Sequence, residues 1–106
     1  MPEALSRSQR RIVADVMAVV EPDGFVISGG VALIASGVSS RATRAFDAFS
    51  PTCDDVGLVA VRLVERLRGS GYLVDVHHSD AAFARMTVST GKYRRTMSVV
   101  ELGRDV

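Results

Sequence analysis

The chain has 106 residues, of which 47% are hydrophobic and 24% are charged. This length fits a single domain, and this composition excludes intrinsic disorder. The formal net charge of +1 excludes a general attraction to polyanions, so nucleic acid would have to bind at a local site. One cysteine, Cys53, excludes an internal disulfide and a cysteine-based zinc site. Because no apolar run approaches the roughly 20 residues that span a bilayer and no secretory signal is evident, we expect a cytoplasmic protein without a membrane partner.

The first half of the chain alternates between helical and extended patterns. Apolar residues at helical spacing predict a helix over residues 3–20, which the Glu-Pro-Asp-Gly sequence at 21–24 ends. Residues 25–27 predict a buried strand that leads into Gly29-Gly30, and residues 31–35 predict a second helix. Residues 44–49 predict another strand, with Ala45 and Asp47 on one face because strand side chains alternate.

The second half predicts one long helix followed by three strands. Asp54 or Asp55 caps the helix, and its expected core positions are Val56, Leu58, Val59, Val61, Leu63, Val64 and Leu67. The strands are expected at residues 72–77, 83–89 and 93–102, with residues 90–92 as a hairpin connection between the last two. The fold class is therefore α+β, with a mixed sheet of about five strands and flanking helices. A final strand so close to the chain end is expected to leave an exposed sheet edge, and hence a possible route to a homo-oligomer.

Two local features are candidates for chemistry. A strand that runs into Ser28-Gly29-Gly30 and then into a helix would place backbone N–H groups and a positive helix end where a phosphate can bind. The same glycines also serve as a connection that binds nothing. Asp47 puts a carboxylate in an otherwise apolar strand, so it needs a cation, solvent, or an ion pair with Arg41 or Arg44.

The order and spacing of longer stretches are more specific than either feature. GFVISGGVALIASGVSSRATRAFDAFS, then LVAVRLVERLRGSG, then FARMTVSTGKYRRTMSVVELGRDV resemble the nucleotidyltransferase toxins of the AbiEii/AbiGii abortive-infection family over roughly residues 25–106. The resemblance implies a polymerase-β-like fold, with residues 1–106 as one nucleotidyltransferase-like domain, the catalytic half of a longer architecture that continues into a helical region. It implies transfer of a nucleoside monophosphate from a nucleoside triphosphate to an RNA hydroxyl such as the 3′ end of tRNA. A cognate antitoxin would be the partner.

The same resemblance assigns roles to individual residues. Gly29 and Gly30, with Ser28 and Arg41, would bind the nucleotide. Asp47 and Glu101 would be catalytic carboxylates that bind two Mg²⁺ ions, which activate the attacking hydroxyl and neutralise the leaving pyrophosphate.

Ala45 is the main departure, because the family has Asp at this position and a methyl group binds no metal. Val31 after the glycines, and Ser28 rather than a basic residue before them, also weaken the expected grip on the triphosphate. We therefore expect a nearly inactive enzyme, with metal binding weakened. An engineered replacement and a naturally degenerate paralogue both account for Ala45. The alternative function is a non-catalytic, truncated domain that binds nucleotide, RNA or a protein partner.

The remaining polar features have simpler interpretations. His77 and His78 are adjacent on a strand and point to opposite faces, so we expect them in a solvated turn and not on one metal ion. Cys53 is expected to be structural. Two basic clusters, one at Arg7, Arg10 and Arg11 and one at Lys92, Arg94 and Arg95, predict solvated surface, and the second is the better candidate for RNA contact.

Overall fold

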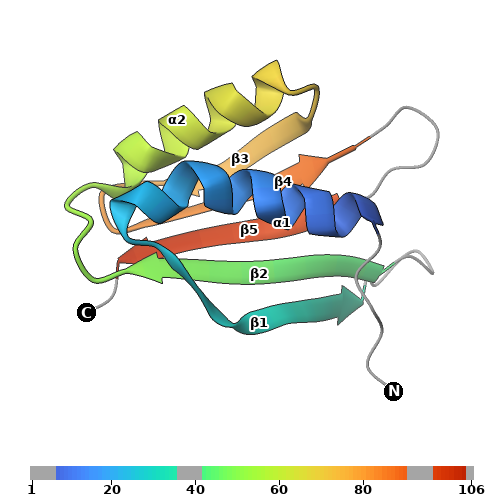
Figure 1. Ribbon diagram of the computed structural model, residues 1–106, viewed down its shortest axis with the longest axis horizontal. Helices are drawn as coiled ribbons and strands as arrows, with labels where there is room; N and C mark the ends of the chain where they lie inside the picture. The colour runs from blue at the N-terminus through green and yellow to red at the C-terminus, as the bar shows by residue number, and fades with distance from the viewer. Residues whose placement is uncertain (1–6, 36–41, 91–96, 105–106) are drawn as a thin grey trace.

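The computed structural model describes residues 7–35, 42–90 and 97–104 of the chain. In these ranges two helices pack on one face of a five-stranded mixed sheet, so the predicted α+β class is confirmed (Figure 1). The elements are α1 (Arg7–Val20), β1 (Val26–Ala35), β2 (Ala42–Ser50), α2 (Val56–Gly69), β3 (Leu73–Ser79), β4 (Phe83–Ser89) and β5 (Met97–Arg104). Within the described ranges, no helix combines the length and the apolar character needed to cross a bilayer.

Helix α1 ends where the sequence predicts. A 3-10 turn, Glu21–Asp23, follows the helix, and Gly24 then adopts a φ of 86°, which favours glycine. Ser50 donates a hydrogen bond of 2.8 Å to the carbonyl oxygen of Asp23, which joins this turn to the end of β2. Tyr72, which follows α2, donates a 2.5 Å hydrogen bond to the carboxylate of Asp15 and so links α1 to the segment after α2. These contacts fix α1 over the sheet.

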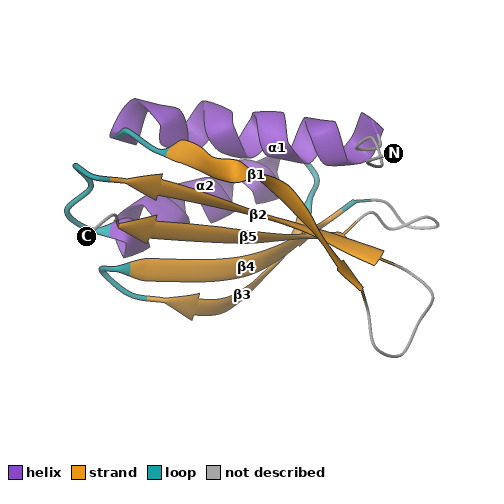
Figure 2. Cartoon of the chain, turned by 90° about the horizontal axis from the view of Figure 1, so that it is seen from below, coloured by secondary structure: helices purple, strands orange, loops and turns teal. Residues whose placement is uncertain are grey.

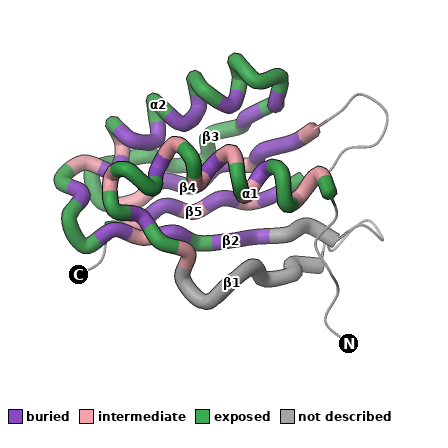
Figure 3. The backbone as a smooth tube through the Cα atoms, in the orientation of Figure 1, coloured by how far each residue is buried: buried purple, intermediate pink, exposed green. Residues whose placement is uncertain are grey.

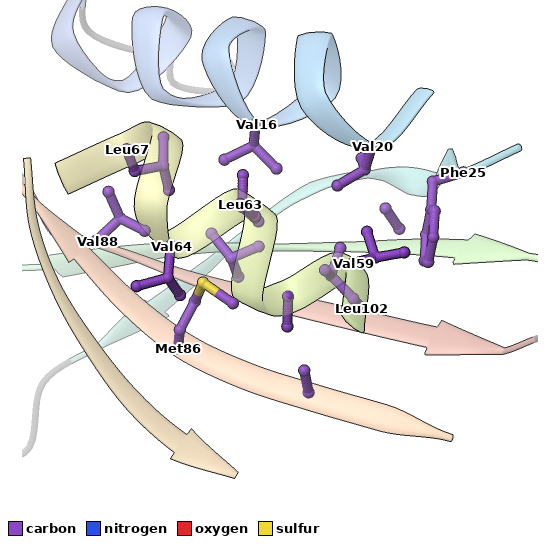
Figure 4. Packing of buried hydrophobic residues seen from close by; sticks show 14 of the residues in the cluster. Val16, Val20, Phe25, Val59, Leu63, Val64, Leu67, Met86, Val88 and Leu102 are labelled. Carbon is purple, nitrogen blue, oxygen red and sulfur yellow. The ribbon is translucent and has the colours of Figure 1, made fainter. Parts of the chain in front are cut away.

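Helix α2 is capped by the second of the two candidate aspartates. Asp55 accepts a hydrogen bond from the backbone N–H of Leu58 at 3.4 Å. The expected core positions Leu58 and Val61 are wrong: they are 65% and 55% exposed. At 100° per residue they fall on the side of the helix opposite the buried stripe. That stripe consists of Val56, Val59, Ala60, Leu63, Val64 and Leu67, and it packs on the inner face of the sheet with α1 (Figure 4).

The strands lie in the order β1-β2-β5-β4-β3. All neighbours are antiparallel except β2 and β5, which are parallel. Both helices lie on one face of the sheet, and no described helix lies on the other, which we call the open face (Figure 2). Residues of the central strands alternate between buried and more exposed positions, as two unequal faces require (Figure 3).

Two predictions about the sheet are wrong. The final strand is not an exposed edge, because β5 lies between β2 and β4 and the described edges are β1 and β3. Residues 31–35 are not a helix: they continue β1 and pair with β2, Ala32 opposite Ala45. A five-residue apolar run is too short to form a stable helix alone, whereas in a strand its backbone is hydrogen-bonded to a neighbour. The predicted start of the last strand and its hairpin partly fall on residues 91–96, outside the described ranges.

Candidate functional site

Asp47 and Glu101 lie side by side on the open face. They are Cα partners in the parallel pairing of β2 with β5. The neighbours of Asp47, Phe46 and Ala48, are buried against the helices, so Asp47 itself points to the opposite face. Two acidic side chains that are 54 residues apart in sequence are thereby brought onto adjacent strands, which are spaced about 5 Å apart.

Arg85 completes a row of three charged side chains across three strands. It is the Cα partner of Glu101 on β4, and its Nε donates a hydrogen bond of 2.6 Å to Oε2 of Glu101. The Arg85 side chain is 51% exposed and that of Glu101 is 25% exposed. The guanidinium carbon also lies 5.7 Å from the centre of the Phe83 ring, within the range of a cation–π contact. Arg85 therefore has two partners on the open face.

The electrostatic state of Asp47 follows from this row. Desolvation by burial raises the pKa of Asp47 above its ordinary value of 3.8, a hydrogen bond with Glu101 and the charge of Glu101 raise it further, and the charge of Arg85 lowers it. The hydrogen bond favours the protonated form because only protonated Asp47 can donate to the neighbouring carboxylate. The two acids thus compete for the single positive charge of Arg85.

The glycine segment lies beside this pair, but in a form that the sequence does not predict. Ile27 pairs with Ala48 and Val31 with Phe46, so the three residues 28–30 oppose Asp47 alone in a bulge of β1. Glycines within a strand commonly mark such a bulge or a close backbone approach. The expected helix N-terminus is absent here because residues 26–35 are extended, so no helix dipole contributes to phosphate binding at this point. The bulge nevertheless brings the Gly29-Gly30 backbone to the strand position next to Asp47.

Ala45 shares the face of Asp47, as predicted from strand alternation. It lies two residues before Asp47 and is the Cα partner of Val99 on β5. Ala45 is only 8% exposed, so an acidic side chain at this position would be less solvated than Asp47.

Several predicted site residues fall where the structure describes no side chain. Arg41 of the nucleotide site, and Lys92, Arg94 and Arg95 of the RNA cluster, lie outside the described residues; Ser28 and Arg44 are described in their backbone only. Arg85, the cation of the site, is not predicted from the sequence. Its alternation with the buried Ala84 and Met86 could have placed it on the open face, but the pairing with Glu101 depends on the β4–β5 register.

The two histidines occupy a strand and not a turn. His77 contacts Thr87 Oγ1 through Nε2 at 2.7 Å, while His78 contacts Asp80 at 2.6 Å. They belong to β3, whose register against β4 shifts between Val76 and His78. The two histidines therefore hydrogen-bond to different residues. Cys53 is a buried free thiol, in keeping with a structural role.

The donor set fits one hard cation better than two. Across the described residues, no group of three His, Cys, Asp or Glu side chains is arranged to hold a metal ion. Asp47 and Glu101 supply two carboxylates on one face, and Mg²⁺ is usually held by one or two carboxylates together with water and substrate phosphates. These two residues would hold a single ion, and Arg85 already occupies Oε2 of Glu101.

Comparisons with known proteins leave the family open. No family model matches the chain, and no curated protein matches it either. The assignment of a function therefore depends on the residues of the open face and on the sequence patterns that accompany them.

Proposed function

We propose that the open face is a nucleotidyl-transfer site of the polymerase-β type in which Ala45 has removed one metal-binding carboxylate. The observation that carries the proposal is the in-register pair of Asp47 and Glu101 beside the Ser28–Gly30 bulge, with Ala45 on the same face. Acidic residues at positions 45, 47 and 101 would form one cluster, because residues two apart on a strand point the same way and β5 is the neighbouring strand. The sequence pattern from the glycines to Glu101 supports the same assignment.

Each described residue has a definite task in this reaction. When bound, Mg²⁺ supplies charge neutralisation for the phosphates and lowers the pKa of the attacking hydroxyl. Asp47 and Glu101 would hold the ion, and the bulged backbone of β1 would lie next to it, where backbone N–H groups could donate to phosphate oxygens. Arg85 would compensate the negative charge of Glu101 while the ion is absent.

The substrate classes follow from the resemblance and not from the geometry. They are a nucleoside triphosphate and an RNA acceptor, with the tRNA 3′ end as the first acceptor to test. In the same way, a cytoplasmic toxin paired with an antitoxin is the biological setting that we infer. With Ala45 in place, transfer is expected to be lower by at least about 10- to 100-fold, the loss that follows even from removing a residue that merely supports a metal ligand.

The test is to restore the missing carboxylate. The Ala45→Asp variant is incubated with Mg²⁺, each of the four labelled nucleoside triphosphates and total RNA, and labelled RNA is measured. The matched control is Ala45→Asp combined with Asp47→Asn, which keeps the new carboxylate and removes its neighbour. Label transfer by the single variant and none by the double variant supports the proposal; a folded Ala45→Asp variant that labels no RNA with any nucleotide refutes it.

A second function has one observation in its favour. The 2.6 Å ion pair between Arg85 and Glu101 compensates the charge of Glu101 without a metal ion, as in a domain that binds its partner without catalysis. In that case the Ala45→Asp variant transfers no label, and the chain still binds nucleotide, RNA or a protein partner in a Mg²⁺-independent manner.

A further inference from the structure

The ion pair of Arg85 with Glu101 differs in its surroundings from the other ion pair between an arginine and an acid on the described surface. Arg62 and Asp23 form a 2.7 Å pair on the helical side of the molecule, with side chains 58% and 31% exposed and no second acid in the pairing. Arg85 instead faces a Glu101 that is 25% exposed and has Asp47 as its other neighbour across the strands. Arg85 thus lies beside Asp47 and Glu101, the only two acids that the β2–β5 register pairs in the described strands.

Two structural features hold Arg85 in this position. Its backbone is fixed by the antiparallel register of β4 with β5, in which Arg85 is opposite Glu101. Its guanidinium lies over the Phe83 ring, whose other neighbour is His78 at a ring distance of 5.9 Å. Stacking on an aromatic ring restrains the planar guanidinium, so less conformational entropy is lost when it binds the carboxylate.

The charges of the row decide which cation the acids can accept. Two ionised carboxylates and one guanidinium leave a net charge of −1, whereas the same carboxylates without Arg85 would leave −2. The two carboxylates alone neutralise a divalent ion, whereas with Arg85 present a bound divalent ion leaves an excess positive charge. In addition, Oε2 of Glu101 already accepts a charge-assisted hydrogen bond, so a metal ion could bind this oxygen only by displacing Arg85.

We propose that Arg85 is a built-in counter-ion that competes with divalent metal ions for Glu101 and so sets the metal affinity of the open face. The inference rests on the proposed function in taking Asp47 and Glu101 as the metal-binding pair. It adds that metal binding requires the Arg85 side chain to leave Glu101. The side chain can do so, because it is half exposed and is attached to a strand whose backbone need not move.

The experiment measures binding of Mn²⁺ to the whole chain with Ala45 unchanged, from the electron paramagnetic resonance signal of free Mn²⁺. Arg85→Gln should bind Mn²⁺ about 3- to 10-fold more tightly than the wild type, the range expected for removing one positive charge about 6 Å from a divalent ion at a largely solvated site. Arg85→Lys keeps the charge and should resemble the wild type. The matched control is Arg62→Gln, which makes the same change in net charge and breaks an exposed ion pair on the helical side.

The origin of the gain is tested by adding Glu101→Gln to Arg85→Gln. The double variant should lose the gain. A gain that persists in it overturns the inference, as does Mn²⁺ affinity of Arg85→Gln that stays within twofold of the wild type, or no Mn²⁺ binding by any variant. Circular dichroism checks that each variant folds, and Arg85→Met replaces Arg85→Gln should the latter fail to fold.

The outcome for Arg85 is separate from the outcome for nucleotidyl transfer. Tighter Mn²⁺ binding by Arg85→Gln, with no labelled RNA from Ala45→Asp, supports the role of Arg85 as a counter-ion and refutes nucleotidyl transfer. Labelled RNA from Ala45→Asp, with no change of Mn²⁺ affinity in Arg85→Gln, supports nucleotidyl transfer and refutes the role of Arg85 as a counter-ion.

Discussion

Replacing Asp47 by Asn should make the fold more stable while it removes a proposed metal ligand. Asp47 and Glu101 lie on neighbouring strands, which are spaced about 5 Å apart. Two like charges at this separation repel by about 0.8 kcal/mol in water, and more where the dielectric constant is lower. Arg85 attracts Asp47 and offsets part of this repulsion. We therefore expect Asp47→Asn to raise the free energy of unfolding by about 0.5 kcal/mol at pH 7, or Tm by about 2–4 °C.

The pH dependence of this difference gives a sharper test. Because the pKa of Asp47 in the folded protein is raised above its ordinary value of 3.8, protonated Asp47 contributes stability below pH 3.8, and this contribution is lost as the pH rises through the raised pKa. Wild type and Asp47→Asn should thus be equally stable at pH 3 and diverge above it. Urea unfolding at several pH values measures the difference. Asp75→Asn, on β3 opposite Thr87, is the matched control and should change little. A destabilising effect of Asp47→Asn at pH 7, or a difference that does not vary with pH, would refute the reasoning.

Two further predictions concern the packing of the helices. Tyr72→Phe should lower the free energy of unfolding at pH 7 by about 1–2 kcal/mol, because it removes a hydrogen bond to the carboxylate of Asp15. Burial, followed by this hydrogen bond, raises the pKa of Tyr72 to about 12, so the contribution of the hydroxyl to stability is present below pH 10 and is lost by about pH 12. Equal stability of the two proteins at pH 7 would contradict this prediction. Leu63→Ala should cost about 3–5 kcal/mol in urea unfolding because Leu63 is fully buried, whereas Leu58→Ala, at 65% exposure, should cost under about 1 kcal/mol; similar losses from both would contradict the packing of α2.

The elements that the sequence predicts well are those whose signals are local. The end of α1 follows from a Pro and a Gly within four residues, and the start of α2 from an aspartate before a long apolar stripe. The placement of Ala45 and Asp47 on one face needs only the alternation of a strand. Each of these depends on neighbours in sequence, so a single chain suffices.

The features that the sequence does not predict depend on contacts between distant segments. The apolar residues 31–35 are compatible with a helix or a strand, and pairing with β2 decides for the strand. Leu58 and Val61 look like core residues until the orientation of α2 over the sheet is known. The parallel insertion of β5 beside β2 places the last strand in the middle of the sheet, and no local pattern indicates it.

In the candidate site, too, the residue types follow from local sequence, whereas their arrangement depends on contacts between distant strands. The sequence pattern indicates Asp47 and Glu101, but their adjacency depends on the β2–β5 register. Arg85 carries no motif at all, and its part in the site appears only when β4 lies against β5. A search for acidic residues alone therefore finds the proposed ligands and misses the cation that balances them.

The thermal stability of the Ala45→Asp variant tests the metal site without RNA or nucleotide. A third carboxylate at a position that is only 8% exposed adds repulsion and desolvation, so without metal the variant should unfold at a lower temperature than the wild type. A metal ion that binds only the folded state opposes this loss, and the stabilisation grows with the ratio of metal concentration to Kd. For a Kd of about 1 mM, 10 mM Mg²⁺ would restore about 1.4 kcal/mol, or about 6–11 °C in Tm. The wild type, which lacks the third carboxylate, should shift less, and a thermal melt with Ca²⁺-free buffer and matched ionic strength measures both. An equal Mg²⁺ shift in wild type and variant would mean that position 45 does not face the metal site, because a carboxylate that cannot reach the ion adds repulsion without adding affinity.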